Sequence, residues 1–568
     1  MKKIYFFRFS SLMITIFLLS VNFLQGQDPL ADILRQELNR EMKAFKNENV
    51  PPYYLAYRVD DEYITSYASS FGSLISANDS RTRILTTEMR VGNYDFDNSH
   101  PVEEGMNFGN MDFGYGISLP VEDSSLAIRQ LIWQATNSAY LNAVSSYSSI
   151  KSKLKQQKIS NVADFSKESP VVYFEPRIHP DSLSFDKLSW REKVKKFSAP
   201  FLDDPSIISG NATIRLVIDR KYFVSSEGTS IAQNQYYVQL QIEGAIKSDD
   251  GNILPAFRSF YSYDPSGLPD DTIVMREVHL LVKKLKLLKA AKKAEPYSGP
   301  AILSPAAAAV FFHEIFGHRI EGERLRNKFD SQTFKNKVGD KVLPKFMSVI
   351  SDPTLSRFDG QDLIGYYKYD EEGIAGQRVT VVDKGLLKDF LMSRSPIEGF
   401  QHSNGHGRAQ AGYLPVARQS NLLIETSEPK SDKDLRKMLI RECKKEGKEY
   451  GYYFKQVTGG FTMTDRFSPN VFNIMPTEVY RIYVDGRPDE LVRGVDLIGT
   501  PLAMFSEIEA AGDHPEVFTG FCGAESGGIP VTAISPSLFV NKIETQKKPE
   551  TSGQLPVLPR PDSEIKEK

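Results

Sequence analysis

The spacing of apolar residues changes several times along the chain and predicts an alternation of helices and strands. Apolar residues three or four positions apart indicate helices at about 30–46, 124–155, 189–197 and 271–294. Alternating apolar and polar residues, bounded by turn-forming residues, indicate strands at 54–59, 64–67, 82–91, 212–226 and 233–243. Because neighbouring strands of this kind pair antiparallel and helices stand between the groups, the pattern predicts an α+β fold.

A break in the pattern at residues 295–300, Glu-Pro-Tyr-Ser-Gly-Pro, indicates a domain boundary. Beyond it the chain is mostly β. Hairpins are predicted around 383–385 and 485–488, and helices at about 431–446 and 501–511. We therefore predict two domains, an N-terminal strand and helix domain at 27–295 and a β-rich C-terminal domain at 296–544. A Pro-, Lys- and Glu-rich tail at 545–568 is predicted to be disordered.

The first 26 residues have the pattern of a secretory signal peptide. Lys2, Lys3 and Arg8 precede an apolar run from Leu12 to Leu24, with cleavage predicted near Gly26. The run is short for a membrane span, and no later stretch is apolar for long enough, so we expect no stable membrane span. An uncleaved anchor is the alternative. The sequence thus predicts an exported protein, periplasmic or secreted.

Charge and cysteine content narrow the possible functions further. The formal net charge of −2 over 568 residues, together with the lack of a recognisable motif, argues against nucleic acid as a partner. The chain has two cysteines, Cys443 and Cys522. In an exported protein such a pair is compatible with one disulfide, and this alternative competes with metal binding.

The run HEIFGH at 313–318 carries the strongest chemical signal. It follows an alanine-rich helix that is predicted to start at Ser304 and Pro305. Neutral imidazoles are the commonest zinc ligands, and Glu314 is placed to take a proton from a water activated by the ion. However, residues five apart point about 140° away from each other on a regular α-helix. We therefore predict a helix with a π-type bulge at Gly317, which brings His313 and His318 onto one face. Two histidines without a metal, each satisfied by protein contacts, are the alternative.

The C-terminal half resembles the TldD/PmbA family of metallopeptidases, in particular its TldD-like catalytic branch. The resemblance rests on HEIFGH and on blocks in the same order before and after it: Ser298-Gly299-Pro300, Glu321-Gly322, Asp370 to Gly373, Gln377-Arg378, Gly405 to Arg408, Pro415 to Arg418 and Gly520 to Gly523. It implies a zinc ion held by His313, His318 and Cys522, with Glu314 as the general base. Three protein ligands would leave a fourth position open, as hydrolytic zinc requires.

The resemblance also bears on partners and on the compartment. The family is best known as cytoplasmic and often as a two-protein assembly. It therefore implies a homo- or hetero-dimer with a related chain, whereas the predicted signal peptide places this chain outside the cytoplasm.

Other side chains are weaker candidates for the site. His406 and Arg408 could stabilise an oxyanion, and either Glu321 or Glu323 could orient a ligand histidine.

The predicted function is that of a zinc metallopeptidase of the HExxxH type, acting on peptides or unfolded proteins. An extended substrate could bind as an added strand at an edge of the β-rich domain. One alternative is an exported peptide-binding or assembly protein that keeps a structural metal site without proteolysis. Another is hydrolysis of a non-peptide amide at the same site.

Overall fold

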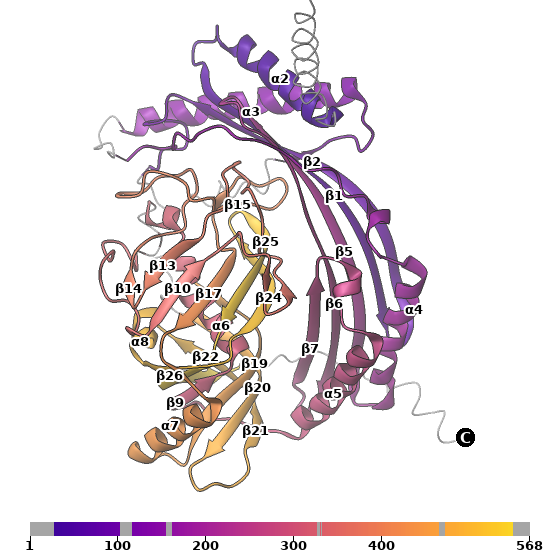
Figure 1. Ribbon diagram of the computed structural model, residues 1–568, viewed down its shortest axis with the longest axis vertical. Helices are drawn as coiled ribbons and strands as arrows, with labels where there is room; N and C mark the ends of the chain where they lie inside the picture. Colours follow the sequence, from indigo (N-terminus) through magenta and orange to yellow (C-terminus); the bar gives the residue numbers. More distant parts are fainter. Residues whose placement is uncertain are drawn as a thin grey trace, which may run out of the picture.

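The computed structural model describes residues 28–102, 116–154, 162–326, 330, 332–464 and 472–548 (Figure 1). The predicted signal peptide at 1–26 lies outside these residues. The tail was predicted to be disordered from residue 545, but strand β26 (Leu538–Lys547) continues through its first residues, so that start is wrong; the tail from residue 549 onward lies outside the described residues. The fold is mixed α+β, as the sequence predicted. In the described part of the chain, no helix combines the length and the apolar character that a membrane crossing requires.

One sheet dominates the N-terminal half and curves around one side of the C-terminal half (Figure 1). Its strand order is β3-β2-β1-β5-β6-β4, and β7 pairs with β6. The strands are β1 (Pro52–Ser70), β2 (Ser73–Val91), β3 (Gly116–Ser118), β4 (Val172–Phe174), β5 (Ile207–Ser225), β6 (Ser230–Lys247) and β7 (Ile253–Ser262). The helices are α2 (Pro29–Phe45), α3 (Ser125–Lys153), α4 (Lys187–Ser198) and α5 (Asp271–Ala290).

The strands between residues 52 and 91 correct the sequence prediction. Three short strands were expected there, with a turn at 78–80. Instead, β1 and β2 each run for 19 residues. The polar stretch of β2 stays paired with β1 throughout, and the chain reverses at Phe71 and Gly72, where both residues have positive φ. The exposed polar residues at 78–80 therefore belong to a solvated part of a strand and not to a turn, because backbone pairing does not require apolar side chains.

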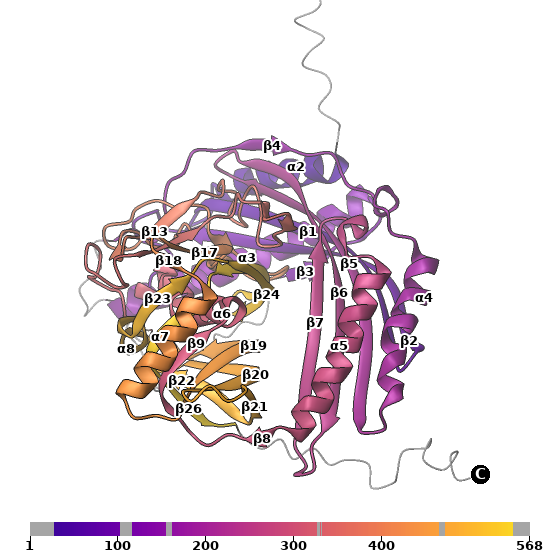
Figure 2. The same cartoon turned by 60° about the horizontal axis from the view of Figure 1, so that its bottom comes forward.

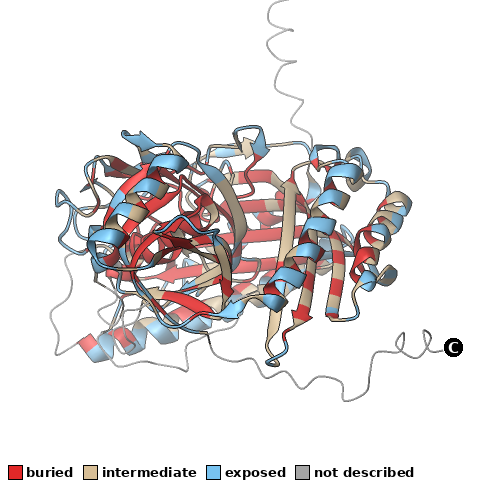
Figure 3. Cartoon of the chain, turned by 90° about the horizontal axis from the view of Figure 1, so that it is seen from below, coloured by how far each residue is buried: buried red, intermediate tan, exposed pale blue. Residues whose placement is uncertain are grey.

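Side chains alternate between the two faces of the N-terminal sheet. Along β6, Leu240 and Ile242 are buried in the core beneath α5, whereas the odd-numbered residues from Gln239 to Ala245 turn toward the C-terminal half. Figure 3 shows this alternation as bands of buried and less buried residues across the strands. One face of the sheet therefore packs against helices, and the other forms a polar wall.

Two sheets build the C-terminal half. The first has the order β14-β13-β10-β17-β25-β24, and the second has the order β18-β23-β26-β9-β19-β20-β21-β8, with β22 pairing with β20 and β26. The strands up to residue 426 are β8 (Lys292–Lys293), β9 (Ser298–Leu303), β10 (Met347–Ser351), β11 (Arg357–Phe358), β12 (Gln361–Asp362), β13 (Val379–Asp383), β14 (Leu386–Leu387), β15 (Gly407–Arg408), β16 (Val416–Ala417) and β17 (Asn421–Thr426). The later strands are β18 (Pro429–Lys430), β19 (Tyr450–Thr462), β20 (Phe472–Tyr483), β21 (Glu490–Arg493), β22 (Val495–Gly499), β23 (Ile508–Gly512), β24 (Glu516–Ala524), β25 (Gly527–Ser535) and β26 (Leu538–Lys547). Both predicted hairpins are present, as β13–β14 and β20–β21.

The helices of this half are α6 (Pro305–Ile315), α7 (Asp432–Lys445) and α8 (Pro501–Ser506). The prediction of a helix at about 501–511 is wrong in its second half. Residues Ile508–Gly512 form strand β23, which pairs with β26. Helix α6 lies between the two sheets, in contact with β19 and β20 on one side and with β24 and β25 on the other. Its start is fixed by Ser304, whose hydroxyl accepts a hydrogen bond from the N–H of Ala307 and donates one to the carbonyl of Lys455.

A buried ion pair joins the two halves of the chain. The guanidinium of Arg394 binds both carboxylate oxygens of Glu227, at 2.6 and 2.8 Å, and donates to the carbonyl of Ser166. Only 1% of the Arg394 side chain and 15% of the Glu227 side chain are exposed, so the arginine is buried and the glutamate is largely buried. Removing one partner of a buried pair leaves the other charge without compensation, which costs far more than an exposed pair contributes.

We expect Arg394→Ala to lower the free energy of unfolding by about 3 kcal/mol, because Glu227 would keep a charge without its buried counterion. Chemical denaturation followed by tryptophan fluorescence measures the change. The matched control is Arg436→Ala, which removes an exposed bidentate pair with Asp489 and should cost less than about 1 kcal/mol. Equal losses for the two variants would contradict the assigned role of Arg394.

Candidate metal centre

The interval between the two histidines departs from the predicted π-bulge. Helix α6 ends at Ile315, and a 3₁₀ turn follows at Gly317–Arg319. The predicted widening of the helix is therefore wrong, because the chain leaves the helix before it reaches His318. The tighter turn carries His318 back toward the side of His313, and the two rings lie 5.0 Å apart between centroids. A break followed by a turn thus solves the spacing problem that a bulge was expected to solve.

Gly317 is needed for a close approach of another segment. A Cβ atom at this position would lie 1.9 Å from the side-chain oxygen of Gln419. Gln419 in turn donates a hydrogen bond to the carbonyl of His313 at 3.2 Å. Arg319 donates to the carbonyls of Glu314 and Ile315, at 3.0 and 3.1 Å. The end of α6 is therefore closed by side chains that satisfy its last carbonyl groups.

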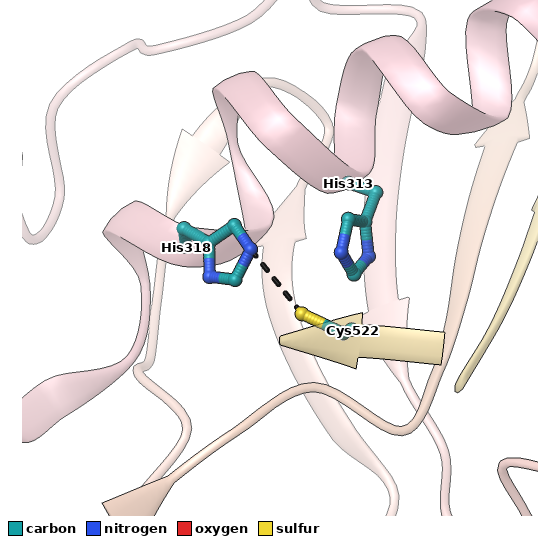
Figure 4. Close-up of side chains that lie close together, drawn as sticks. All are labelled: His313, His318 and Cys522. Atoms are coloured by element: carbon teal, nitrogen blue, oxygen red, sulfur yellow. Dashed lines mark hydrogen bonds between the residues drawn. The ribbon is translucent and has the colours of Figure 1, made fainter. Parts of the chain in front are cut away.

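Three potential metal ligands converge at this helix end (Figure 4). His313 comes from α6, His318 from the 3₁₀ turn and Cys522 from strand β24. One ligand atom from each lies within 4.8 Å of the other two, and the Cys522 Sγ is 3.3 Å from the His318 Nε2. In a tetrahedral zinc site, nitrogen and sulfur ligands stand about 3.5 Å apart. The donor set and its spacing therefore fit a zinc ion.

Buried charges hold the His318 ring in place. Its Nδ1 lies 3.1 Å from a carboxylate oxygen of Glu321, which leaves Nε2 directed at Cys522. The same carboxylate accepts a hydrogen bond from Arg324 at 2.7 Å. Although burial alone raises the pKa of Glu321, His318 and Arg324 lower it to about 2. Of the two glutamates considered from the sequence, Glu321 thus contacts a ligand histidine, as outer-shell carboxylates in zinc sites do.

Glu323 has a different environment. It accepts hydrogen bonds from the N–H of Ala417, at 2.8 Å, and from the hydroxyl of Ser393, at 3.2 Å. Burial and the nearby Glu525 raise its pKa to about 8. Its contacts join the turn after α6 to the segment that carries β16.

The electrostatics of Cys522 favour a thiolate. Burial alone would raise the pKa of its thiol, but His318 and His313 lower it well below the ordinary value. In the same way, burial would lower the pKa of His318, but Cys522 and Glu321 raise it well above its usual range. Arg418 fixes the strand by donating to the Cys522 carbonyl at 2.6 Å. Such thiolate and imidazole donors bind a metal in exchange for protons.

The two cysteines do not form a disulfide. Both thiols are free. The charged residues next to Cys443, Arg441-Glu442 and Lys444-Lys445, predict that it lies on a solvated helix surface, and this prediction is wrong. It is fully buried on the inner side of α7, in an apolar cluster with Leu435, Leu439 and Ile302. The neighbouring lysines and glutamates in the sequence hid this, because a helix with one apolar stripe can be polar at most of its positions.

The ligands and Glu314 open into one cleft of about 830 Å³. One wall comes from β6 and β7 of the N-terminal sheet, and the other comes from α6, β19, β24 and β25. Figure 2 shows β7 at the edge of its sheet, facing the C-terminal half. Glu314 is 8% exposed and packs against Gly460. A Cβ atom added at Gly460 would lie 2.8 Å from the Cγ of Glu314. Burial raises the pKa of the Glu314 carboxyl above its ordinary value.

His406 and Arg408 are not part of the cleft lining, which corrects the role expected for them. His406 is fully buried, with Nε2 3.0 Å from the Ser351 hydroxyl. Arg408 donates to the carbonyls of Gln419 and Pro530, at 2.7 and 2.9 Å. Their hydrogen bonds go to other parts of the protein, so they support the fold around the site and are not placed to meet a substrate oxyanion.

Sequence reasoning missed Arg418 and Gln419 as supports of the site. Arg418 is the last residue of the block at 415–418 that carried the family resemblance, and Gln419 follows it directly. Nothing in their local pattern indicates that they reach Cys522 and His313. Residues 516–535 were also not predicted to form the hairpin β24–β25 that places Cys522. Several glycines and the exposed Phe521 obscure the alternation of apolar residues there.

Comparison with known proteins is consistent with this site. Residues 296–547 match the family model described as the PmbA/TldA metallopeptidase C-terminal domain. A metalloprotease of Methanocaldococcus jannaschii is 25% identical over 341 residues, which are 60% of this chain and 67% of the relative. A zinc metalloprotease TldD homolog of Saccharolobus solfataricus is 25% identical over 264 residues, which are 46% of this chain and 54% of the relative. The chain therefore spans about half to two thirds of the length of these two curated relatives.

The fold has a counterpart among solved structures. The crystal structure of TldE from Thermococcus kodakarensis aligns with a TM-score of 0.61 and covers 90% of this chain and 100% of that chain, at 14% identity. At this identity the likeness concerns the fold. The family model and the relatives named as metalloproteases show that residues 296–547 are similar to the TldD/PmbA family, and the solved structure adds a likeness of the fold alone.

Proposed function

We propose that this protein is an exported, zinc-dependent peptidase that cleaves peptides or unfolded proteins. The observation that carries the proposal is the convergence of His313, His318 and Cys522 beside Glu314 in one cleft. Relatives that are named metalloproteases support the class of reaction, and the zinc named for one of them agrees with the donor set. Export follows from the N-terminal sequence pattern alone.

His313, His318 and Cys522 would hold the ion, and Glu321 would orient His318. A zinc ion in this position supplies Lewis acidity, which polarises a carbonyl group and lowers the pKa of water. With three protein ligands, a fourth position stays open for the reacting groups.

Glu314 would move the proton in the reaction. It follows His313 directly and faces the same cleft, so its carboxylate is within reach of a water held near the ligands. The pKa of its carboxyl is raised above the ordinary value, so it lies nearer to neutral pH than the pKa of an exposed glutamate. A carboxylate of this kind can accept a proton from the attacking water and then return it to the leaving amine.

The cleft is suited to the backbone of an extended chain. Among the described strands, β24 pairs only with β25, and β7 pairs only with β6. Edge strands offer free N–H and C=O groups to which a peptide can add as a further strand. Glycines at 459, 520 and 523 leave further backbone of the cleft uncovered by side chains. Recognition through the main chain would favour unfolded segments over folded ones.

A partner chain is part of the proposal. The proposed assembly is a homo- or hetero-dimer with a related chain, and it rests on the resemblance of the sequence to a family that often forms two-protein assemblies. Light scattering of the purified protein, alone and with a related chain, distinguishes the two forms.

The metal site predicts selective protection of one thiol. With zinc bound, alkylation of Cys522 by iodoacetamide should be slow, and removal of the metal by a chelator should make it fast, since the thiolate is then free. Mass spectrometry of the alkylated peptides measures both cysteines. Cys443 is the internal reference, because burial raises its pKa to about 11 and it should stay unmodified in both conditions. Alkylation of Cys522 that zinc does not slow would contradict its role as a ligand.

The proposed base predicts a loss of turnover without a loss of metal. Glu314→Gln should bind zinc as the unaltered protein does, but cleave denatured casein at least about 100-fold more slowly, because the proton acceptor is missing. Zinc analysis and fluorescence of labelled casein give the two readouts, and chelation should abolish cleavage by the unaltered protein. Casein that is bound but never cut by the zinc-loaded, unaltered protein would favour a binding function instead.

A further inference from the structure

One carboxylate in the cleft has no cationic partner among the described residues. Glu243 lies on β6, in the polar wall of the cleft that the N-terminal sheet provides. Its two oxygens accept hydrogen bonds from the amides of Gln241, at 2.7 Å, and Asn211, at 3.4 Å. Amide donors satisfy hydrogen bonding but leave the negative charge uncompensated. Glu243 can therefore attract a cation that enters the cleft.

The other charges of the cleft are already engaged. Arg324 is the one lysine or arginine among the described residues that line the cleft. It is bound by Glu321 at 2.7 Å, Asp330 at 3.4 Å and Glu525 at 3.1 Å. Glu314 stands beside the proposed metal ligands. Apart from the proposed metal ion, the described cleft thus offers a negative charge without a cationic partner at Glu243 and no free lysine or arginine, which disfavours an acidic side chain near Glu243.

The opposite wall carries exposed aromatic rings. Phe461 on β19 and Phe521 on β24 are each 46% exposed and line the cleft. Phe518 lines the same wall. Large apolar side chains that stay exposed inside a concave site gain from covering by an apolar ligand group. The cleft therefore combines an apolar feature and an acidic feature.

Phe521 and Glu243 are separated along the cleft. Phe521 packs on Tyr237 of β6, with 5.9 Å between ring centroids, so the two walls meet there. Glu243 lies six residues further along the same strand and on the same face, which is about 20 Å away in an extended strand. An extended peptide of about six residues spans the same length. A single bound peptide can thus place one side chain at Phe521 and another at Glu243.

We propose that the substrates of this site are cationic amphipathic peptides, with a basic side chain at Glu243 and a large apolar side chain at Phe521. The inference rests on the proposed peptidase function, and it adds a substrate class to it. The main chain would supply most of the binding, and these two positions would select among unfolded peptides.

Four matched fluorogenic peptides test the proposal with the zinc-loaded, full-length protein. They have the same length and differ only at two positions. The residues at these two positions are Lys and Leu, Gln and Leu, Glu and Leu, or Lys and Ser. We expect the Lys and Leu peptide to have a kcat/KM about fivefold higher than the Gln and Leu peptide, the size of a partly exposed ion pair. The Glu and Leu peptide should be the poorest of the Leu-containing three. The advantage of lysine should shrink at high salt, because screening weakens exposed charge pairs.

The variant Glu243→Gln isolates the acidic feature. It keeps the shape of the side chain but removes the charge, so the ratio of kcat/KM between the Lys and Gln peptides should fall to about one. Glu516→Gln is the matched control, since Glu516 is an exposed acid on β24 that does not line the cleft. With Glu516→Gln, the ratio of kcat/KM between the Lys and Gln peptides should equal the ratio measured with the unaltered protein. Equal kcat/KM for the Lys and Glu peptides in the unaltered protein, or an unchanged ratio in Glu243→Gln, would overturn the proposed substrate class.

Binding separates this inference from the proposed function. Fluorescence anisotropy with the Glu314→Gln variant measures the affinity for the same labelled peptides without turnover. We expect the Lys and Leu peptide to bind about fivefold more tightly than the Gln and Leu peptide, which would support the selectivity of the cleft. If the unaltered protein cleaved none of the peptides, only the proposed peptidase function would be overturned. Equal binding of the Lys and Glu peptides would reject the selectivity of the cleft whether or not cleavage occurs.

Discussion

The burial of α6 between two sheets is the constraint on which the rest of the structure depends. Nine of its eleven residues are buried, and eight of these nine are apolar. Such a helix is stable only when other elements enclose it, and here β19 and β20 cover one side while β24 and β25 cover the other. The enclosure brings strand β24 to the end of the helix. Cys522 therefore meets His313 and His318 because the core needs that strand there.

The end of a buried helix creates a second requirement, since its last carbonyl groups must find donors. Arg319 and the turn after Ile315 supply them, and the same turn delivers His318. The break in the helix thus serves hydrogen bonding and ligand geometry together. A continuous helix would have satisfied the carbonyls equally well but would have directed His318 away from Cys522.

Buried charges around the centre compensate one another in a chain. Glu321 contacts both His318 and Arg324, and Arg418 donates to the carbonyl of Cys522. In a low-dielectric interior each of these groups would be costly alone, so every member fixes the position of the next. The network reaches from the turn after α6 to β24. Glu243 contrasts with it, because it lies on the open polar wall and has amide partners only.

The two walls of the cleft come from different halves of the chain and have different chemistry. The C-terminal wall carries the metal ligands, bare backbone and aromatic rings, whereas the N-terminal wall is a polar sheet face. Edge strands β24 and β7 both border this space. Under the proposed function, the edge strands would hold an extended chain through its backbone, whatever its sequence, and Glu243 would add a modest electrostatic selection at one position.

The sequence by itself determined the elements with strong local signals. The α+β class, the helix start at Ser304, helix α7 and the hairpins at 383–385 and 485–488 follow from periodicity, capping and turn chemistry, which act within a few residues. The two histidines, Glu314 and the family resemblance were also visible without coordinates. Only the tertiary structure decided how the five-residue interval is bridged, that Cys443 is buried, that Glu321 supports His318, and that His406 and Arg408 lie away from the cleft. These features depend on contacts between residues that are far apart in the chain, such as Gln419 against Gly317 and β24 against α6, and no local pattern encodes such packing.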